Sequence, residues 1–193
     1  MIDYIKGTLT QITPAFLTIE TGGVGYFINI SINTFSRLEG KSDYKVLVHE
    51  VIREDSHQLY GFADSEERSV FRLLISVTGV GANTARVMLS SLSPGELEKA
   101  IIGSDVNVLK SIKGIGLKTA QRIIVDLKDK LGKHTGSDEI FTFADNTIRD
   151  EALSALVMLG FAKSAVSKVL EKVVREEKNL TIEDMIKRAL KNL

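Results

Sequence analysis

The sequence contains no cysteine. Disulfide bonds, thiolate metal sites and a cysteine nucleophile are therefore excluded. It also lacks an apolar run long enough to span a membrane, and its first residues, MIDYIKGTL, carry charged side chains where a signal peptide needs an apolar core. We therefore expect a soluble, cytoplasmic protein.

The net charge of the chain is zero, because 25 Lys and Arg residues balance 25 Asp and Glu residues. The overall balance thus gives no indication of a nucleic-acid partner, and the position of the charges matters more. Between Val108 and Lys133, seven cations stand against only two acidic residues, Asp126 and Asp129. The cations are Lys110, Lys113, Lys118, Arg122, Lys128, Lys130 and Lys133. This segment is a basic island in a neutral protein.

The residue pattern changes twice in the first two thirds of the chain. Residues 1–63 contain short runs rich in β-branched and aromatic residues, separated by glycines, which predicts a small barrel or sandwich. Residues 64–132 have apolar residues at helical spacing. Residues 133–146 are rich in Gly, Ser, Thr and acidic residues, which predicts a flexible linker.

Residues 147–193 are predicted to form three helices. The first is expected to open at Thr147, where an aspartate follows three residues later, and the second after Gly160. The third is expected to open at Thr181, which is followed by an aspartate at the same spacing. A bundle of this length is near the lower limit for independent folding.

The middle segment contains one pattern twice. SVTGVGANTA begins at Ser76, and SIKGIGLKTA begins at Ser111, 35 residues later. Each copy lies between two apolar helical patterns, and the central residue of its Gly-x-Gly turn, Val80 or Ile115, is expected to point inward. One copy alone is better explained by a plain turn between helices. Two copies with matching flanks predict a pair of helix-hairpin-helix motifs.

These motifs predict a phosphate-binding backbone. Glycine permits a left-handed turn and, having no Cβ, lets a phosphate approach the chain closely. Free N–H groups of the turn and of the next helix then point toward one anion, at the positive end of that helix. Contacts to phosphate carry no base-sequence information. The expected binding residues are Gly79, Gly81, Asn83, Thr84 and Arg86 in the first copy and Gly114, Gly116, Lys118, Thr119 and Arg122 in the second.

The two copies differ in one respect. Asn83 stands in the first copy where Lys118 stands in the second, so we expect the first copy to bind phosphate more weakly. Neither copy matches a nucleotide-binding loop, because Leu117 separates Gly116 from the lysine and threonines stand where a dinucleotide fingerprint needs a third glycine. We expect no cofactor, and any ATP used with this protein to be bound by another chain.

Three segments carry a resemblance to a known family. They are REDSHQLYGF, which ends at Phe62, GIGLKTAQRIIVDLKDKL, which begins at Gly114, and the C-terminal ALVMLGF with IKRALKNL. Together with the paired motifs, they make the whole chain resemble the RuvA family of Holliday-junction branch-migration subunits.

The resemblance implies an α+β multidomain fold. Residues 1–63 would form an OB-fold (oligonucleotide-binding) β-barrel and residues 64–132 a tandem helix-hairpin-helix domain. Residues 147–193 would form a three-helix bundle similar to ubiquitin-associated (UBA) domains.

The resemblance also implies a function and partners. The chain would be a non-catalytic subunit that recognises four-way (Holliday) junctions by structure and stimulates the RuvB ATPase in recombination, DNA repair and the SOS response. It would form a homotetramer, single or paired, and would join the RuvC resolvase in a larger complex.

Five residues receive roles only through the resemblance. Glu54 and Asp55 match an acidic pin at a hairpin tip, although acids at an exposed turn are usually just solvated. Leu156, Leu159 and Phe161 match a patch that contacts the motor, although an apolar stripe at this spacing is usually core.

Two other functions stay open. Helix-hairpin-helix motifs also occur in DNA glycosylases, ligases and nucleases, but Asp126 and Asp129 lie among lysines, where ion pairing explains them better than catalysis. The histidines, His49, His57 and His134, are scattered and predict no metal site.

In the second alternative function, the chain is an adaptor whose main binding site is the three-helix segment. The basic island argues against this hypothesis, because a middle domain that is only a scaffold needs no excess of positive charge.

Overall fold

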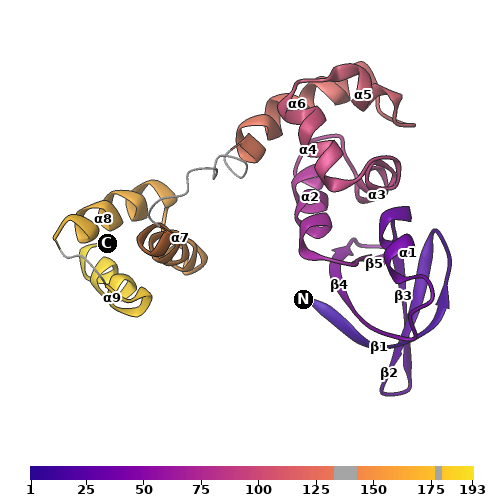
Figure 1. Cartoon of the computed structure of the whole chain (residues 1–193), viewed down its shortest axis with the longest axis horizontal. Coiled ribbons are helices and arrows are strands. Elements are labelled where there is room, and N and C mark those ends of the chain that lie inside the picture. Colours follow the sequence, from indigo (N-terminus) through magenta and orange to yellow (C-terminus); the bar gives the residue numbers. More distant parts are fainter. Residues whose placement is uncertain (133–142, 177–179) are drawn as a thin grey trace. The chain divides into compact units, whose positions relative to one another are not determined.

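A computed structural model describes residues 1–132, 143–176 and 180–193 of the chain (Figure 1). By the contacts between residues, the chain divides into two units, Met1–Gly136 and Ser137–Leu193. The first unit contains a barrel and helices α1 to α6, and the second contains α7 to α9. Among the described residues, no helix is both long and apolar enough to cross a membrane.

The first unit begins with a closed barrel in the strand order β1-β2-β3-β5-β4. Strands β3 and β5 are parallel, and the other neighbours are antiparallel. Because side chains alternate along a strand, Leu17 and Ile19 both point into the barrel and are fully buried. The strands are β1 (Tyr4–Ile12), β2 (Phe16–Thr21), β3 (Val24–Ile30), β4 (Asp43–Ile52) and β5 (His57–Phe62).

A short helix, α1 (Ile32–Leu38), separates β3 from β4. The residue pattern predicts only strands here, because seven residues are too few for a helical period to stand out. The hydroxyl of Ser31 accepts the N–H of Thr34 at 3.0 Å and caps the helix. Leu38, at its end, is fully buried in the barrel core.

The remaining helices of the first unit share a core with one side of the barrel. Phe71 of α2 packs against the rings of Tyr60 and Phe62 on β5, with centroid distances of 5.3 and 4.9 Å. Figure 1 shows these helices gathered beyond the end of β5. They are α2 (Ser65–Ile75), α3 (Ala82–Ser91), α4 (Pro94–Ile102), α5 (Val106–Ser111) and α6 (Leu117–Gly132).

The second unit consists of α7 (Phe143–Met158), α8 (Lys163–Glu176) and α9 (Ile182–Asn192). Thr181 caps α9 as predicted, since its hydroxyl accepts the N–H of Asp184 at 3.2 Å. Helix α7 starts earlier than predicted, so residues 143–146 are helical rather than part of the linker. A Thr-x-x-Asp pair fits the start of a helix, but nothing before Thr147 prevents the helix from extending backwards. The rest of the predicted linker, residues 133–142, lies outside the described residues.

Candidate nucleic-acid interface

The two repeated segments fold into hairpins of the same geometry. The first glycine of each turn has a left-handed backbone, with φ of +93° at Gly79 and +91° at Gly114. The next N–H, of Val80 or Ile115, donates to a carbonyl three residues back at 3.0 Å in both copies. The Val80 and Ile115 side chains are 5 % and 6 % exposed, so both point inward as predicted.

The outer side of each hairpin is open backbone. A Cβ atom built on Gly79, Gly81, Gly114 or Gly116 would meet nothing within 4 Å. The first helical hydrogen bond of α3 runs from the N–H of Ala85 to Gly81, and α6 begins in the same way four residues after Gly116. The N–H groups of residues 82–84 and 117–119 therefore have no acceptor in their own helices. Each hairpin thus offers free donors and space for one anion.

The second hairpin also has free cations. Lys113 and Lys118 are exposed, and neither takes part in an ion pair with any described residue. Arg122 is exposed too, but its Nη1 donates to the carbonyl of Thr78 at 3.1 Å. Because Thr78 belongs to the turn of the first hairpin, this bond joins the two hairpins. Thr119 is half-buried at the start of α6.

The side chains of the first hairpin are arranged differently. The guanidinium of Arg86 donates to the carbonyl of Ala15, to the side chain of Asn29 and to the side chain of Asn83. Arg86 and Thr84 are half-buried. Within the first hairpin itself, Asn83 carries no charge and the charge of Arg86 is already hydrogen-bonded to three acceptors of the chain.

The two residues of the predicted acidic pin lie at the tip of the β4–β5 hairpin. The N–H of Arg53 donates to the carbonyl of Ser56 at 2.8 Å and closes the turn. Glu54 and Asp55, between them, are both exposed. A cavity of about 370 Å³ lies between the stem of this hairpin and the first helix-hairpin-helix turn. Its lining includes Ile52, Arg53, Val80, Gly81 and Ala82.

One buried carboxylate lies between the barrel and α2. Glu67 is 1 % exposed, and the hydroxyls of Ser31 and Thr34 donate to its two oxygens, the second at 2.6 Å. Burial raises the pKa of Glu67 above its ordinary value, against the effect of these hydrogen bonds. Because both donors flank or belong to α1, this cluster joins α1 to α2.

Asp126 and Asp129 were expected to pair with lysines; Asp126 has no such pair among the described residues, and for Asp129 this stays a prediction, because Lys133, four residues later, lies outside them. Both are exposed, and neither is in an ion pair within residues 1–132, 143–176 and 180–193. On a regular helix, exposure leaves the longer lysine side chains free to stay in water rather than fold onto a neighbour. Over the same part of the chain, no group of three or more His, Asp or Glu residues lies close enough to hold a metal.

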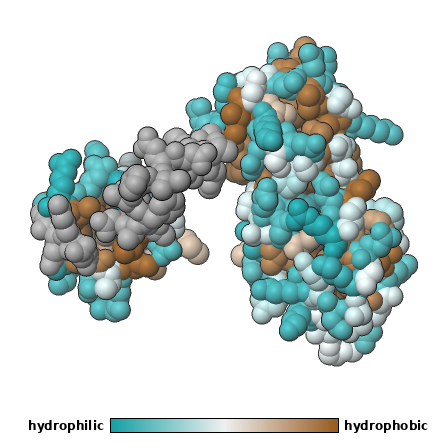
Figure 2. Space-filling model, viewed as in Figure 1, coloured by the Kyte–Doolittle hydropathy of each residue, from teal (hydrophilic) through white to brown (hydrophobic). Residues whose placement is uncertain are grey.

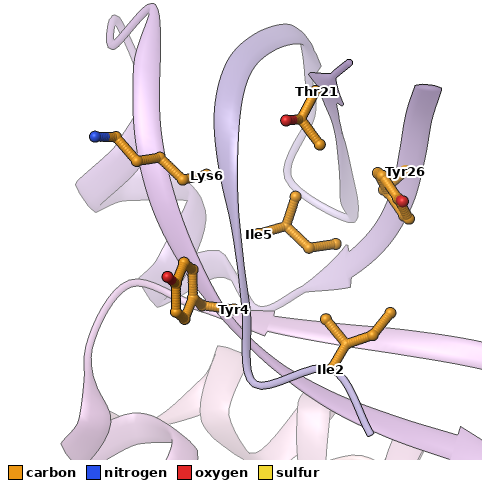
Figure 3. Close-up of a pocket in the computed structure, with 6 residues that line it drawn as sticks. All are labelled: Ile2, Tyr4, Ile5, Lys6, Thr21 and Tyr26. Carbon is orange, nitrogen blue, oxygen red and sulfur yellow. The ribbon is translucent and has the colours of Figure 1, made fainter. Parts of the chain in front are cut away.

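A second cavity, of about 330 Å³, lies on the barrel beside the first strand. Figure 3 shows Ile2, Ile5, Thr21 and Tyr26 on one side of the β1 ribbon, with Lys6 extending to the other side. The lining combines apolar groups with hydroxyls and the ammonium group of Lys6, and it includes neither a carboxylate nor a histidine.

The predicted motor-contact residues are not equally accessible. Leu156 is fully buried in the core of the second unit, so its assignment to the contact is corrected: its side chain faces α8 and α9. Leu159 and Phe161 are 63 % and 36 % exposed, and Met158, which the sequence pattern did not single out, is 89 % exposed.

The turn after α7 ends the helix before Phe161. The N–H groups of Gly160 and Phe161 donate back to Val157 and Leu156, and Gly160 has a φ of +100°. This reversal is a Schellman motif, which ends the helix and turns the following side chains out of the core. Hydrophobic residues reach the surface of the second unit on the face drawn in Figure 2.

The fold and the paired hairpins define a class: a barrel joined to a tandem helix-hairpin-helix domain with open backbone at both turns, followed by a small helical unit. Three family models match in the same order. They are "RuvA N terminal domain" over residues 1–61, "SAM-like Helix-hairpin-helix tandem" over 71–129 and "RuvA, C-terminal domain" over 147–193. These matches confirm the predicted fold class.

Whole-chain comparisons agree. The chain is 51 % identical over 193 residues to a protein of Christiangramia forsetii, 48 % identical over 201 residues to one of Bacteroides thetaiotaomicron and 49 % identical over 193 residues to one of Flavobacterium psychrophilum. Each alignment covers 100 % of both chains, and each relative is named Holliday junction branch migration complex subunit RuvA. The chain belongs to the RuvA family.

Proposed function

We propose that this chain is the DNA-binding subunit of a branch-migration complex and recognises four-way junctions by their shape. The observation that carries the proposal is the pair of open hairpins in the unit that also bears the acidic tip of β4–β5. The hairpins attract phosphates and the tip repels them, so the unit distinguishes DNA by where its phosphates lie.

Each hairpin binds one phosphate of a duplex arm through the free N–H groups at the start of α3 or α6. Lys118 and Lys113 add positive charge at the second hairpin, where no described partner neutralises them. These contacts fix the register of the protein on DNA without reading bases. Binding is therefore independent of sequence and sensitive to salt.

The acidic tip supplies the discrimination. Two like charges about 4 Å apart cost about 4 kcal/mol at an effective dielectric constant of 20, before screening by salt. A continuous duplex crossing Glu54 and Asp55 brings phosphates close to these carboxylates. The open centre of a four-way junction brings fewer, so the junction is favoured.

Four arms of a junction suit four equivalent subunits, and we propose a homotetramer, single or paired, in which the acidic tips meet at the centre. Leu159 and Phe161 of the second unit then contact the RuvB ATPase, and RuvC is a further partner of the assembled complex. In this proposal the chain acts in the cytoplasm, has no catalytic step of its own and leaves ATP hydrolysis to the motor.

The test compares a synthetic four-way junction with a linear duplex of the same length and composition. We expect tighter binding of the junction, no dependence on base sequence, and a mass by light scattering that fits four or eight chains per junction. Equal affinity for both DNAs would contradict the proposal. Cleavage or base release during incubation with junction or damaged DNA and Mg²⁺ would instead support an enzyme. A fragment ending at Lys133 that fails to bind DNA would support the adaptor.

A further inference from the structure

Arg86 lies on α3, one turn after the residues whose N–H groups face the proposed phosphate. Its Nη1 donates to the carbonyl of Ala15 and to Oδ1 of Asn29, both at 3.0 Å. Its Nη2 donates to Oδ1 of Asn83 at 2.8 Å. One half-buried guanidinium thus bonds to the β1–β2 turn, to β3 and to the first turn of α3.

On the barrel side, the hydrogen bonds of Arg86 and Asn29 connect to β5, the strand that follows the acidic tip. Asn29 pairs with Tyr60 in the parallel β3–β5 ladder, and its side-chain amide donates to the carbonyl of Leu59 at 3.2 Å. The charge of Arg86 is close enough to Tyr60 to oppose the rise in the pKa of this tyrosine that burial causes. From Leu59, β5 runs back directly to the turn that holds Asp55.

On the hairpin side, the hydrogen bonds of Arg86 connect to the first turn of α3, whose backbone faces the proposed phosphate. Asn83 supplies one of the three N–H groups at the start of α3 that have no helical acceptor, and its side chain is bonded to Arg86. The far end of α3 is also attached to the barrel unit. Ser90 accepts the N–H of Ile32 at 3.2 Å, and Asn33 donates to the carbonyl of Leu92 at 3.1 Å.

These contacts argue against a direct phosphate role for Arg86. Three acceptors within the chain already use its planar fork, whereas Lys118 has no described partner. A lysine at position 86 would keep the charge, but its single ammonium group cannot reproduce a fork that reaches acceptors on three elements.

We propose that Arg86 is a positioning residue that holds the first hairpin in register with the acidic tip, and that this register sets the preference for junction over duplex. The inference rests on the proposed function, since it concerns how the same surface discriminates DNA. The proposal gives Arg86 a different role from Lys118, which supplies positive charge to the proposed phosphate site of the second hairpin.

The test uses Arg86→Lys in the full chain, with Lys118→Ala as the control for a lost phosphate contact and Arg72→Lys as the control for the same substitution at an exposed arginine of α2. Affinities for junction and duplex are measured over a range of salt concentrations, with a thermal melt of each variant. For Arg86→Lys we expect an unchanged salt slope and a junction-to-duplex preference reduced roughly three- to tenfold. Lys118→Ala should lower the slope by about 0.9 and weaken both DNAs alike.

A second variant keeps the test valid if Arg86→Lys folds poorly. Asn29→Ala removes an acceptor and leaves the arginine charge in place, and it should lower the preference in the same direction. Combined with Arg86→Lys, it should add little, because both changes break one network. Unchanged preference in both variants, even with a lower Tm, would overturn the inference and leave a merely structural contact.

Two further outcomes would separate failure of this inference from failure of the proposed function. If Arg86→Ala lowers the salt slope by about 0.9 while Arg86→Lys restores it with full preference, Arg86 binds phosphate and the inference is wrong. If the wild-type chain shows no preference for junctions, the proposed function itself fails, whatever the variants do.

Discussion

The two glycines of the second hairpin should respond differently to the same substitution. Gly114 has a φ of +91°, whereas Gly116 is not among the positive-φ glycines. A Cβ at either position would meet nothing within 4 Å, so neither alanine variant creates a clash. Backbone strain alone therefore separates the two variants in stability.

Alanine in the left-handed region costs about 1–2 kcal/mol, so Gly114→Ala should lower the free energy of unfolding by that amount and the Tm by several degrees. Gly116→Ala carries no such strain and should stay within about 0.5 kcal/mol of the wild type. Its methyl group, however, occupies the space that a phosphate needs beside the N–H groups of residues 117–119. Losing one hydrogen bond to a charged group costs about 1.5–3 kcal/mol, so junction binding should weaken roughly ten- to a hundredfold.

Thermal melts and junction titrations of both variants test this reasoning, and Gly79→Ala and Gly81→Ala provide the matched pair in the first hairpin. Wild-type affinity in Gly116→Ala would show that the second hairpin does not bind phosphate through its backbone. An unchanged Tm in Gly114→Ala would show that the turn accepts a side chain without strain.

Four further outcomes are expected. Changing Glu54 and Asp55 together to Asn should raise affinity for linear duplex and leave junction binding little changed, more so at low salt, where screening is weaker; a gel-shift comparison at two salt concentrations that shows flat or lower duplex affinity would mean that these are ordinary solvated acids. Lys118→Ala should lower the slope of the logarithm of the binding constant against the logarithm of salt concentration by about 0.9 for every DNA tested, and an unchanged slope would show that this lysine does not contact phosphate. Phe161→Ala should keep junction binding and abolish stimulation of RuvB ATPase activity, whereas loss of both would place the second unit in the DNA-binding surface. Because burial raises the pKa of Glu67, its contribution to stability is full below the ordinary glutamate pKa and is lost as pH rises through the raised value. The stability of Glu67→Gln relative to the wild type should therefore increase as the pH of a urea-unfolding series rises from the ordinary glutamate pKa; a difference that does not vary with pH would contradict this assignment.

Much of this architecture could be predicted because its signals are local. The paired hairpins depend on glycines that recur at fixed spacing, and the inward direction of Val80 and Ile115 follows from that spacing alone. The cap at Thr181 is likewise written in four consecutive residues. Helix α1 was missed because its only local signal, the serine before it, precedes fewer than two turns of helix.

The side chains at the site were harder to assign because their partners are distant in sequence. Arg86 was expected to face phosphate, but its acceptors Ala15 and Asn29 lie 71 and 57 residues away, and only the folded barrel brings them together. Leu156 and Leu159 are three residues apart and look equivalent on a helical stripe. Only the packing of α7 against α8 and α9 decides that the first is core and the second is exposed.

The bond between Asn33 and the end of α3 has a consequence for folding. Asn33 donates to the carbonyl of Leu92, 59 residues away, so a residue of the barrel segment satisfies a carbonyl group that α3 leaves free at its C-terminus. A fragment beginning at Asp64 would lack this partner, and the last turn of α3 would fray. Barrel and hairpins should therefore unfold in a single cooperative transition, with the amide hydrogens of α3 exchanging no faster than those of the barrel strands.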